Sequence, residues 1–192
     1  MSRKEAILEA ARELFNEKGT QHSTTNHIAK AMGISPGNLH YHYKNREEII
    51  RLLYMNMRQE MTLSVNDLPK SILTLQEHEK LLIQIQWKYR FFFKEMLSLF
   101  TRDSQLEDIY IKDNIAHRRR IRQVINNLIM NKELIIDSEE DIDYLVDSIS
   151  ISWQFYSSFL HTLGQELNAT IVQNGIKYTT AAMKPYLLKK EN

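Results

Sequence analysis

A short run near the N-terminus holds side chains that can read the edges of DNA bases. Asn38 and His40 can hydrogen-bond base edges, and Tyr41 can contact a phosphate or a thymine methyl group. Gly37 precedes them, and its lack of a side chain would let the backbone approach a duplex closely. These residue types at this spacing indicate nucleic-acid recognition rather than catalysis.

Groups that can bind phosphates flank this run on both sides. Thr24 and Thr25 place hydroxyls and free amides at the start of a predicted helix, where a phosphate is favoured. Lys44 and Arg46 add positive charge on the other side. The complete set of candidate DNA-binding residues is Thr24, Thr25, Ser35, Pro36, Gly37, Asn38, His40, Tyr41, His42, Lys44 and Arg46.

Four predicted helices would position these groups. Apolar residues recur at helical spacing over residues 3–18, 25–32, 36–41 and 46–63. Gly33 lies between the second and third helices, where a helix-turn-helix needs its turn. Ser35 and Pro36 are typical of an N-cap and a first helical residue, and Asn45 with Glu48 predicts a capping box for the fourth helix.

The order of these residues resembles a known family. Residues 24–48 run TTNHIAKAMGISPGNLHYHYKNREE and follow a helix containing ILEAARELF. This pattern is similar to the DNA-binding head of the tetracycline-repressor (TetR) family, over residues 3–53. Two positions depart from the family pattern: His40 stands where Tyr is usual, and Arg46 where a phosphate-binding Lys is usual. Arg46 keeps the charge, whereas the role of His40 is left open between a phosphate contact, a base contact and none.

Composition favours long helices in the rest of the chain. The sequence has 5 Gly and 3 Pro in 192 residues, and no Gly between Gly37 and Gly164, which excludes turn-rich β folds and glycine-rich nucleotide-binding folds. Helical patterns cover residues 77–100, 105–131, 139–163 and 169–188, after a break at 64–75. We expect an all-α fold with an N-terminal three-helix helix-turn-helix head and a larger helical body. The predicted domains are a DNA-binding domain, residues 1–46, and an effector-binding and dimerisation domain, residues 47–192.

The resemblance implies that the body forms a dimer, and apolar stripes in the last two predicted helices support this. The predicted interface residues are Leu145, Ile149, Ser152, Phe159, Val172, Ile176, Thr179 and Met183. Two helices from each subunit would make a four-helix interface and place two recognition helices one turn of DNA apart, on a near-palindromic operator. The alternative is that the same stripes pack within one chain.

Aromatic residues around a few polar groups suggest a ligand pocket in the body. The candidate residues are Trp87, Arg90, Phe91, Tyr110, His117, Trp153 and Tyr156. Such a cavity would suit a lipophilic or aromatic molecule, or an anion held by Arg90. The alternative is that these aromatics are ordinary core residues. The basic run over residues 117–122 is interpreted as a solvated face, with an anion or DNA site as the alternative.

Several function classes are excluded or disfavoured by absent residues. There is no Cys, no Glu-x-x-His pair, no His-Glu-x-x-His motif and no phosphate loop, so we expect no enzyme activity, metal or cofactor. The first residues do not resemble a signal peptide, and the uncharged stretch 148–165 is too polar to span a bilayer. We therefore expect a cytoplasmic protein without a membrane partner.

The favoured hypothesis is a DNA-binding transcriptional regulator. It would be a homodimeric repressor, released from double-stranded operator DNA by a small lipophilic or aromatic effector. The alternative is a DNA-binding regulator controlled by a protein partner, or one without an effector. The sequence leaves open the effector, the operator, and whether transcription is repressed or activated.

Overall fold

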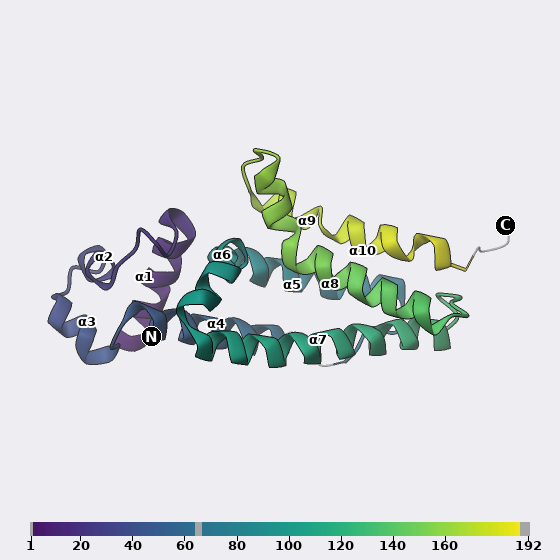
Figure 1. Ribbon diagram of the computed structural model, residues 1–192, viewed down its shortest axis with the longest axis horizontal. Coiled ribbons are helices and arrows are strands. Elements are labelled where there is room, and N and C mark those ends of the chain that lie inside the picture. The colour runs from purple at the N-terminus through teal and green to yellow at the C-terminus, as the bar shows by residue number, and fades with distance from the viewer. Residues whose placement is uncertain (1, 64–66, 189–192) are drawn as a thin grey trace. The chain divides into compact units, whose positions relative to one another are not determined.

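The regular secondary structure of the part that the structure describes consists of helices, joined by short turns and loops. The computed structural model describes residues 2–63 and 67–188 (Figure 1). Its helices are α1 Arg3–Lys18, α2 Thr25–Ala31, α3 Pro36–His42, α4 Arg46–Leu63, α5 Ile72–Lys88, α6 Arg90–Arg102, α7 Ser104–Met130, α8 Glu139–Thr162, α9 Ala169–Gln173, α10 Ile176–Met183 and the short 3₁₀ helix η1 Lys184–Tyr186. The predicted all-α fold is confirmed.

The helices form two compact units. The first contains the residues up to 61 together with 88–108, and the second contains 62–87 together with the residues from 109 onward. The first unit therefore holds α6 as well as the four N-terminal helices. This division follows packing, so it does not coincide with the boundary at residue 46, which was predicted from function and stays a prediction.

Local capping signals determine the helix starts of the first unit. Ser2 caps α1 in a capping box with Glu5, and Ser35 accepts the Asn38 amide at the start of α3, with Pro36 as its first residue. Asn45 accepts the Glu48 amide at 2.8 Å, as predicted. The Glu48 carboxylate, however, accepts the amide of Lys44 rather than that of Asn45.

The single helix predicted over residues 77–100 is wrong, because the chain breaks at Tyr89 between α5 and α6. Side chains of α1 occupy the backbone groups at the break. Arg12 and Asn16 both donate to the carbonyl of Lys88, at 2.9 and 2.8 Å, and Asn16 also accepts the amide of Phe91. These partners are distant in sequence, so the break leaves no local signal. The apolar pattern of residues 77–100 continues at helical spacing past Tyr89, where α5 has already ended.

The helix predicted over residues 169–188 is also divided. It forms α9, α10 and η1, with a break at Asn174 and Gly175. A Cβ atom on Gly175 would lie 3.0 Å from the ring of Tyr156, so the missing side chain allows a close approach to α8. Pro185 lies in η1 and lacks the amide that a continuing helix would use.

The second unit is built around an apolar core from α5, α7, α8 and α10. Its most deeply buried members include Leu128, Ile125, Leu134 and Val146. The segment after α7 returns to the end of the chain, where the Ile135 amide donates to the Tyr186 carbonyl at 2.8 Å. No helix in the described ranges is both long and apolar enough to cross a membrane.

Candidate nucleic-acid interface and ligand cavity

The turn between α2 and α3 has the geometry of a helix-turn-helix. Gly33 adopts a φ of 64°, a left-handed conformation that favours glycine. The next residue, Ile34, returns its amide to the carbonyl of Ala29 at 3.0 Å, which closes the turn. Ile28 and Leu39 are completely buried on either side of it. The turn and the apolar contacts therefore fix the orientation of α3 on α2.

The outer side of α3 presents the polar residues that the sequence predicted. Tyr41 is 86% exposed, whereas Leu39 between its exposed neighbours is fully buried. A Cβ atom on Gly37 would meet no atom within 4 Å, so the fold itself does not require glycine there. Of the candidate residues, Thr25, His42 and Arg46 are half-buried, and the exposed ones are Thr24, Ser35, Pro36, Gly37, Asn38, His40, Tyr41 and Lys44.

The start of α2 is arranged as a helix N-terminus that can accept an anion. The Thr24 hydroxyl accepts the amide of His27, and the His27 ring accepts the amide of Thr24. The remaining first-turn amides have no partner within the helix, which is the arrangement that binds phosphates. Thr24 and Thr25 therefore stay candidates for phosphate contacts.

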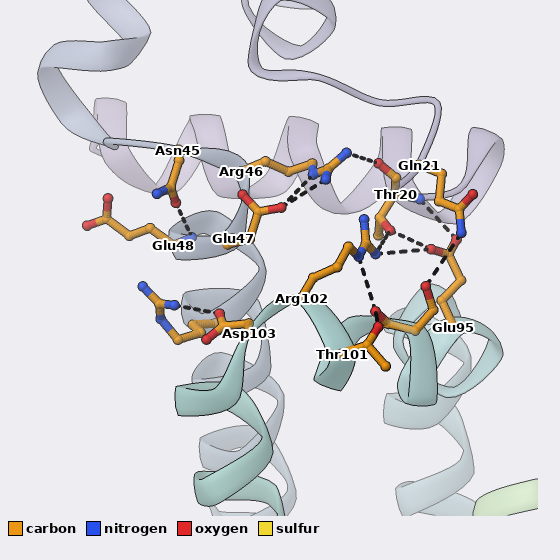
Figure 2. Close-up of polar contacts among 12 residues, drawn as sticks. Thr20, Gln21, Asn45, Arg46, Glu47, Glu48, Glu95, Thr101, Arg102 and Asp103 are labelled. Atoms are coloured by element: carbon orange, nitrogen blue, oxygen red, sulfur yellow. Dashed lines mark hydrogen bonds and ion pairs between the residues drawn. The ribbon is translucent and has the colours of Figure 1, made fainter.

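Arg46 is engaged within the protein. Its guanidinium donates to the Thr20 carbonyl at 2.8 Å and pairs with Glu47, also at 2.8 Å (Figure 2). A phosphate contact by Arg46 would have to share or replace these bonds, so this role stays a prediction. His42 is half-buried and its Nδ1 atom has no hydrogen-bond partner in the described residues.

A polar network attaches the linker after α1 to α6 within the first unit. The amide of Thr20 donates to Glu95 at 2.9 Å, and its hydroxyl donates to the same carboxylate. Arg102 donates to the Thr20 hydroxyl at 2.8 Å, so the buried threonine is held from both sides (Figure 2). The sequence analysis missed Glu95 and Arg102, because charged residues on an amphipathic helix carry no local signal of such contacts.

The second unit contains a cavity between α5, α7, α8 and α10. About 590 Å³ within it is free of protein atoms, including a part that opens to solvent. Its wall is mostly apolar, with polar side chains from His78, Glu79, His117, Arg120 and Thr179. A smaller cavity of about 330 Å³ has Glu79, Thr179 and Trp153 in common with it.

Burial dominates the electrostatics of this cavity. It raises the pKa of Glu79 to about 7, although a hydrogen bond with Thr179 acts in the opposite direction. Burial lowers the pKa of His117 to about 4, with a further contribution from the charge of Arg120. It also lowers the pKa of His78, again aided by Arg120. Both shifts favour the neutral form of the imidazole.

The residues predicted to bind a ligand do not all come together. His117 and Trp153 line the larger cavity, and Trp153 and Tyr156 line the smaller one. Tyr110 donates to Gln154 in the same unit. Trp87 is half-buried and is absent from the walls of both cavities.

Phe91 and Arg90 belong to the first unit instead. The ring of Phe91 packs against Phe15 with centroids 5.4 Å apart and is buried in the first unit, whereas its role as a ligand contact stays a prediction. The cation at the wall of the larger cavity is Arg120 rather than the predicted Arg90. Glu79 and His78 were missed because the sequence does not reveal which face of α5 meets the cavity.

The predicted dimer stripe is largely an internal one. The buried members are Leu145, Ile149, Val172, Thr179 and Met183. Their side chains are buried within the single subunit, and their role at a dimer interface stays a prediction. Ser152 and Ile176 line the smaller cavity. Phe159 is 53% exposed and is the predicted residue that remains available for a dimer.

A different stripe of α8 carries exposed apolar side chains. It consists of Tyr144, Ile151, Phe155 and Phe159, which recur at helical spacing on the side away from the core. The sequence analysis missed this stripe because α8 is apolar on more than one side. The buried residues and the exposed stripe lie on different sides of α8, because successive residues are rotated by about 100° about the helix axis.

Comparison with known families agrees with this geometry. A family model described as "Bacterial regulatory proteins, tetR family" matches residues 7–53. A second, described as "Bacterial transcriptional repressor" and named TetR, matches residues 54–192. The chain belongs to the TetR family. This TetR-family protein is thus a DNA-binding transcriptional regulator, and its fold and family are those of regulators rather than of an enzyme.

Individual relatives are similar in the DNA-binding head or in overall fold. The chain is 44% identical over 48 residues to IcaR, the negative regulator of the biofilm operon icaADBC in Staphylococcus epidermidis. That match covers 25% of this chain and 26% of IcaR. A TetR-family regulator from Marinobacter aquaeolei has a TM-score of 0.90 and 26% identity, covering 98% of this chain and 93% of its own.

A third similar protein has been solved with a small molecule. The complex of SmeT from Stenotrophomonas maltophilia with triclosan has a TM-score of 0.61 and 14% identity to this regulator. The match covers 97% of this chain and 92% of SmeT. At this identity the likeness concerns the fold alone.

Proposed function

We propose that this TetR-family regulator is a dimeric repressor that a small lipophilic molecule releases from a near-palindromic operator. The observation that carries the proposal is the exposed polar side of α3, held by the Gly33 turn and the buried Leu39. Asn38 and His40 would contact base edges in the major groove, and the start of α2 would contact a phosphate. Repression rather than activation is supported by the negative regulator IcaR, which is similar in this head.

The dimer would form through the exposed stripe of α8. Ile151 and Phe159 are 60% and 53% exposed, and such apolar surface is typical of an interaction face. Ser148 is also exposed on this side, and its small side chain would let two α8 helices approach closely. Tyr178 of α10 is exposed as well and would extend the interface. Two subunits joined in this way would present two copies of α3 to two half-sites.

Release would follow from binding in the larger cavity. A ligand that prefers one packing of the second unit would shift the population toward it, and so weaken operator binding. The mostly apolar wall with a few polar groups is typical of small-molecule sites. The triclosan complex of SmeT supports the use of this fold for an aromatic effector. Such a regulator would act in the cytoplasm, where its operator lies.

A salt-dependent gel shift tests the DNA-binding part of the proposal. Fragments upstream of the protein's own gene are titrated with the purified dimer from low to physiological salt. We expect specific binding that weakens as salt rises, because cations are released from the phosphates. An intact dimer that binds none of these fragments at low salt would contradict the proposal.

Mass spectrometry under native conditions tests the effector part. Protein purified under native conditions should retain a small molecule, or its melting temperature should rise with members of a lipophilic library. The operator complex should dissociate when the same compound is added. A folded, operator-binding protein that responds to no compound would instead favour control by a protein partner or the absence of an effector.

A further inference from the structure

The basic run in α7 divides into paired and unpaired arginines. Arg118 pairs with Asp147 and Asp143 of α8, and Arg122 pairs with Asp143 and Glu139. Arg120 lies between them in sequence but lines the larger cavity, and has no ion-pair partner in the described part of the chain. Arg118, Arg119 and Arg120 are all exposed, which fits the interpretation of the run as a solvated face. Arg120 also lines the cavity, so its charge is available to a ligand there.

Two imidazoles line the same cavity as Arg120. His78 of α5 has a buried Nε2 atom without a hydrogen-bond partner among the described residues, and His117 lies one helical turn before Arg120 in α7. The charge of Arg120 acts on both rings, and His78 acts on His117, so the three groups lie near one another. Each imidazole can donate one hydrogen bond while neutral.

The remaining wall of the cavity suits a hydrocarbon or aromatic body. It is formed by Leu75, Leu82, Ile121, Val124, Ile149 and Met183. A ligand that fills this space would remove apolar surface from water on the ligand and on the cavity wall alike. The cavity therefore combines one permanent positive charge and two possible donors with an otherwise apolar lining.

We infer that the effector of this regulator is a lipophilic monocarboxylate whose carboxylate is bound by Arg120 together with His78 and His117. This inference rests on the proposed effector function and names its ligand chemistry. A guanidinium binds a carboxylate through paired, charge-assisted hydrogen bonds, and a neutral alcohol cannot replace them. A cationic head group would be repelled by the unpaired Arg120.

Glu79 is the acidic group that lines this cavity, and in its protonated form it does not oppose an anionic ligand. Its carboxyl is mostly buried, hydrogen-bonded to Thr179, and has one oxygen without a partner in the described residues. Burial raises its pKa to about 7, so near neutral pH a large share of the molecules carry it uncharged. In that form it can donate a hydrogen bond to the ligand rather than repel it.

Matched compounds test the head group separately from the apolar body. The full-length protein is titrated by calorimetry with octanoate, octan-1-ol and octylammonium, and with 4-phenylbutyrate and its alcohol and ammonium counterparts. We expect each carboxylate to bind with a Kd lower than that of its alcohol by about tenfold or more, because a hydrogen bond to a charged group is lost with the alcohol. The ammonium compounds should bind most weakly.

Two arginine variants provide the matched comparison. Arg120→Gln should remove the preference for carboxylate over alcohol and leave alcohol binding unchanged. Arg119→Gln is the control, since Arg119 is an exposed neighbour in α7 that is absent from the cavity wall. Its binding of all compounds should equal that of the unchanged protein. Circular dichroism melts of both variants establish that they are folded.

Each other outcome overturns the inference. Equal binding of carboxylates and alcohols, equal effects of the two variants, a preference for ammonium compounds, or no binding of any series would each exclude a carboxylate at Arg120. The gel shift on the same preparations reports separately on the proposed function. Operator binding that persists without any carboxylate preference would remove the ligand assignment and leave the DNA-binding regulator in place.

Discussion

The two units of the molecule are organised by different kinds of contact. In the first unit, side chains close to one another in sequence cap helices and shape the turn, as Ser35 and Gly33 do at α3. In the second unit, long helices meet through apolar faces, and partners such as Glu79 and Thr179 are a hundred residues apart. Local contacts can be recognised in a sequence, whereas the choice of helix face depends on the packed neighbours.

The largest expected effect concerns the exposed stripe of α8, of which the sequence analysis predicted Phe159 as an interface residue. Phe159→Glu together with Ile151→Glu should convert the dimer to monomer, because two charges on each subunit would be buried in the interface. Operator affinity should fall by about a hundredfold or more, since one half-site contact remains where two acted together. Analytical ultracentrifugation and gel shifts measure the two effects.

A matched control separates the interface from surface charge in general. Leu73 of α5 is also exposed, at 66%, and lies outside the stripe. Leu73→Glu should leave both the dimer and operator binding intact. A double variant that remains dimeric would show that the exposed stripe is not the interface.

The second prediction concerns the first unit, where the local signals agreed with the structure. Asn38→Ala and His40→Ala should each weaken operator binding by about ten- to a hundredfold, the cost of a lost base contact of about 1–3 kcal/mol. The melting temperature should not change, because both side chains are exposed. Gel shifts on the operator fragment and thermal melts provide the measurements.

His22→Ala is the control for these variants, since His22 is exposed in the linker before α2 and is not in the predicted contact set. It should bind the operator as the unchanged protein does. If His40→Ala also binds normally, the departure from the usual Tyr at this position marks a lost contact. Normal binding by Asn38→Ala as well would argue against base recognition by the exposed side of α3.

The accuracy of the sequence analysis follows the same division. Helix starts with a capping residue were located to within a residue, because Ser2, Ser35 and Asn45 act on amides three positions away. The end of α5 was missed because it depends on Arg12 and Asn16, more than seventy residues earlier. The chain matches the TetR family in both its head and its body. From the sequence, the resemblance could be followed residue by residue only in the head, because the motif of the head is local.

The same reasoning explains why the predicted site residues of the second unit do not all lie on one side of their helices. Leu145 and Ile151 are both apolar residues of α8, yet one is buried in the core and the other is 60% exposed. A helix that is apolar on two sides has no single preferred direction in the sequence. The direction is fixed only when α5, α7 and α10 have packed against it. Packing likewise determines that Arg120 lines the cavity whereas Arg118 pairs with acidic residues of α8.

A third prediction addresses the polar network around Thr20 in the first unit. Thr20→Val should lower the free energy of unfolding by about 1–3 kcal/mol, because it removes the buried hydroxyl that donates to Glu95 and accepts from Arg102. Urea unfolding measures the change. Thr101→Val is the control, since Thr101 is exposed on α6 and bonds only its own helix. Equal losses from both variants would mean that the network contributes nothing beyond the general effect of the substitution.

The smallest expected effect is a pH dependence of stability that arises from Glu79 in the second unit. It would test a contact between residues that are far apart in sequence. Glu79 has a pKa of about 7 in the folded protein, above its ordinary value of 4.5. The folded state therefore binds the Glu79 proton more tightly than the unfolded state does. The stability that the protonated carboxyl contributes is lost as the pH rises from about 4.5 to 7. Glu79→Gln removes the titrating group and should stabilise the protein at pH 8 relative to pH 5, by on the order of 1 kcal/mol.

Thermal melts of the full chain at the two pH values measure this difference, with Glu77→Gln on an exposed part of α5 as the control. His78 and His117 face the same cavity, and Arg120 adds a fixed charge. Because these groups are present in both proteins, the effect of Glu79 is taken as the difference in stability between the variant and the unchanged protein. A stability gain from Glu79→Gln that is the same at both pH values would mean that Glu79 is not held in a raised-pKa environment. A gain that is larger at pH 8 than at pH 5 would confirm that the Glu79 carboxyl is held in its protonated form in the cavity wall at the lower pH, where it can donate a hydrogen bond to a bound carboxylate.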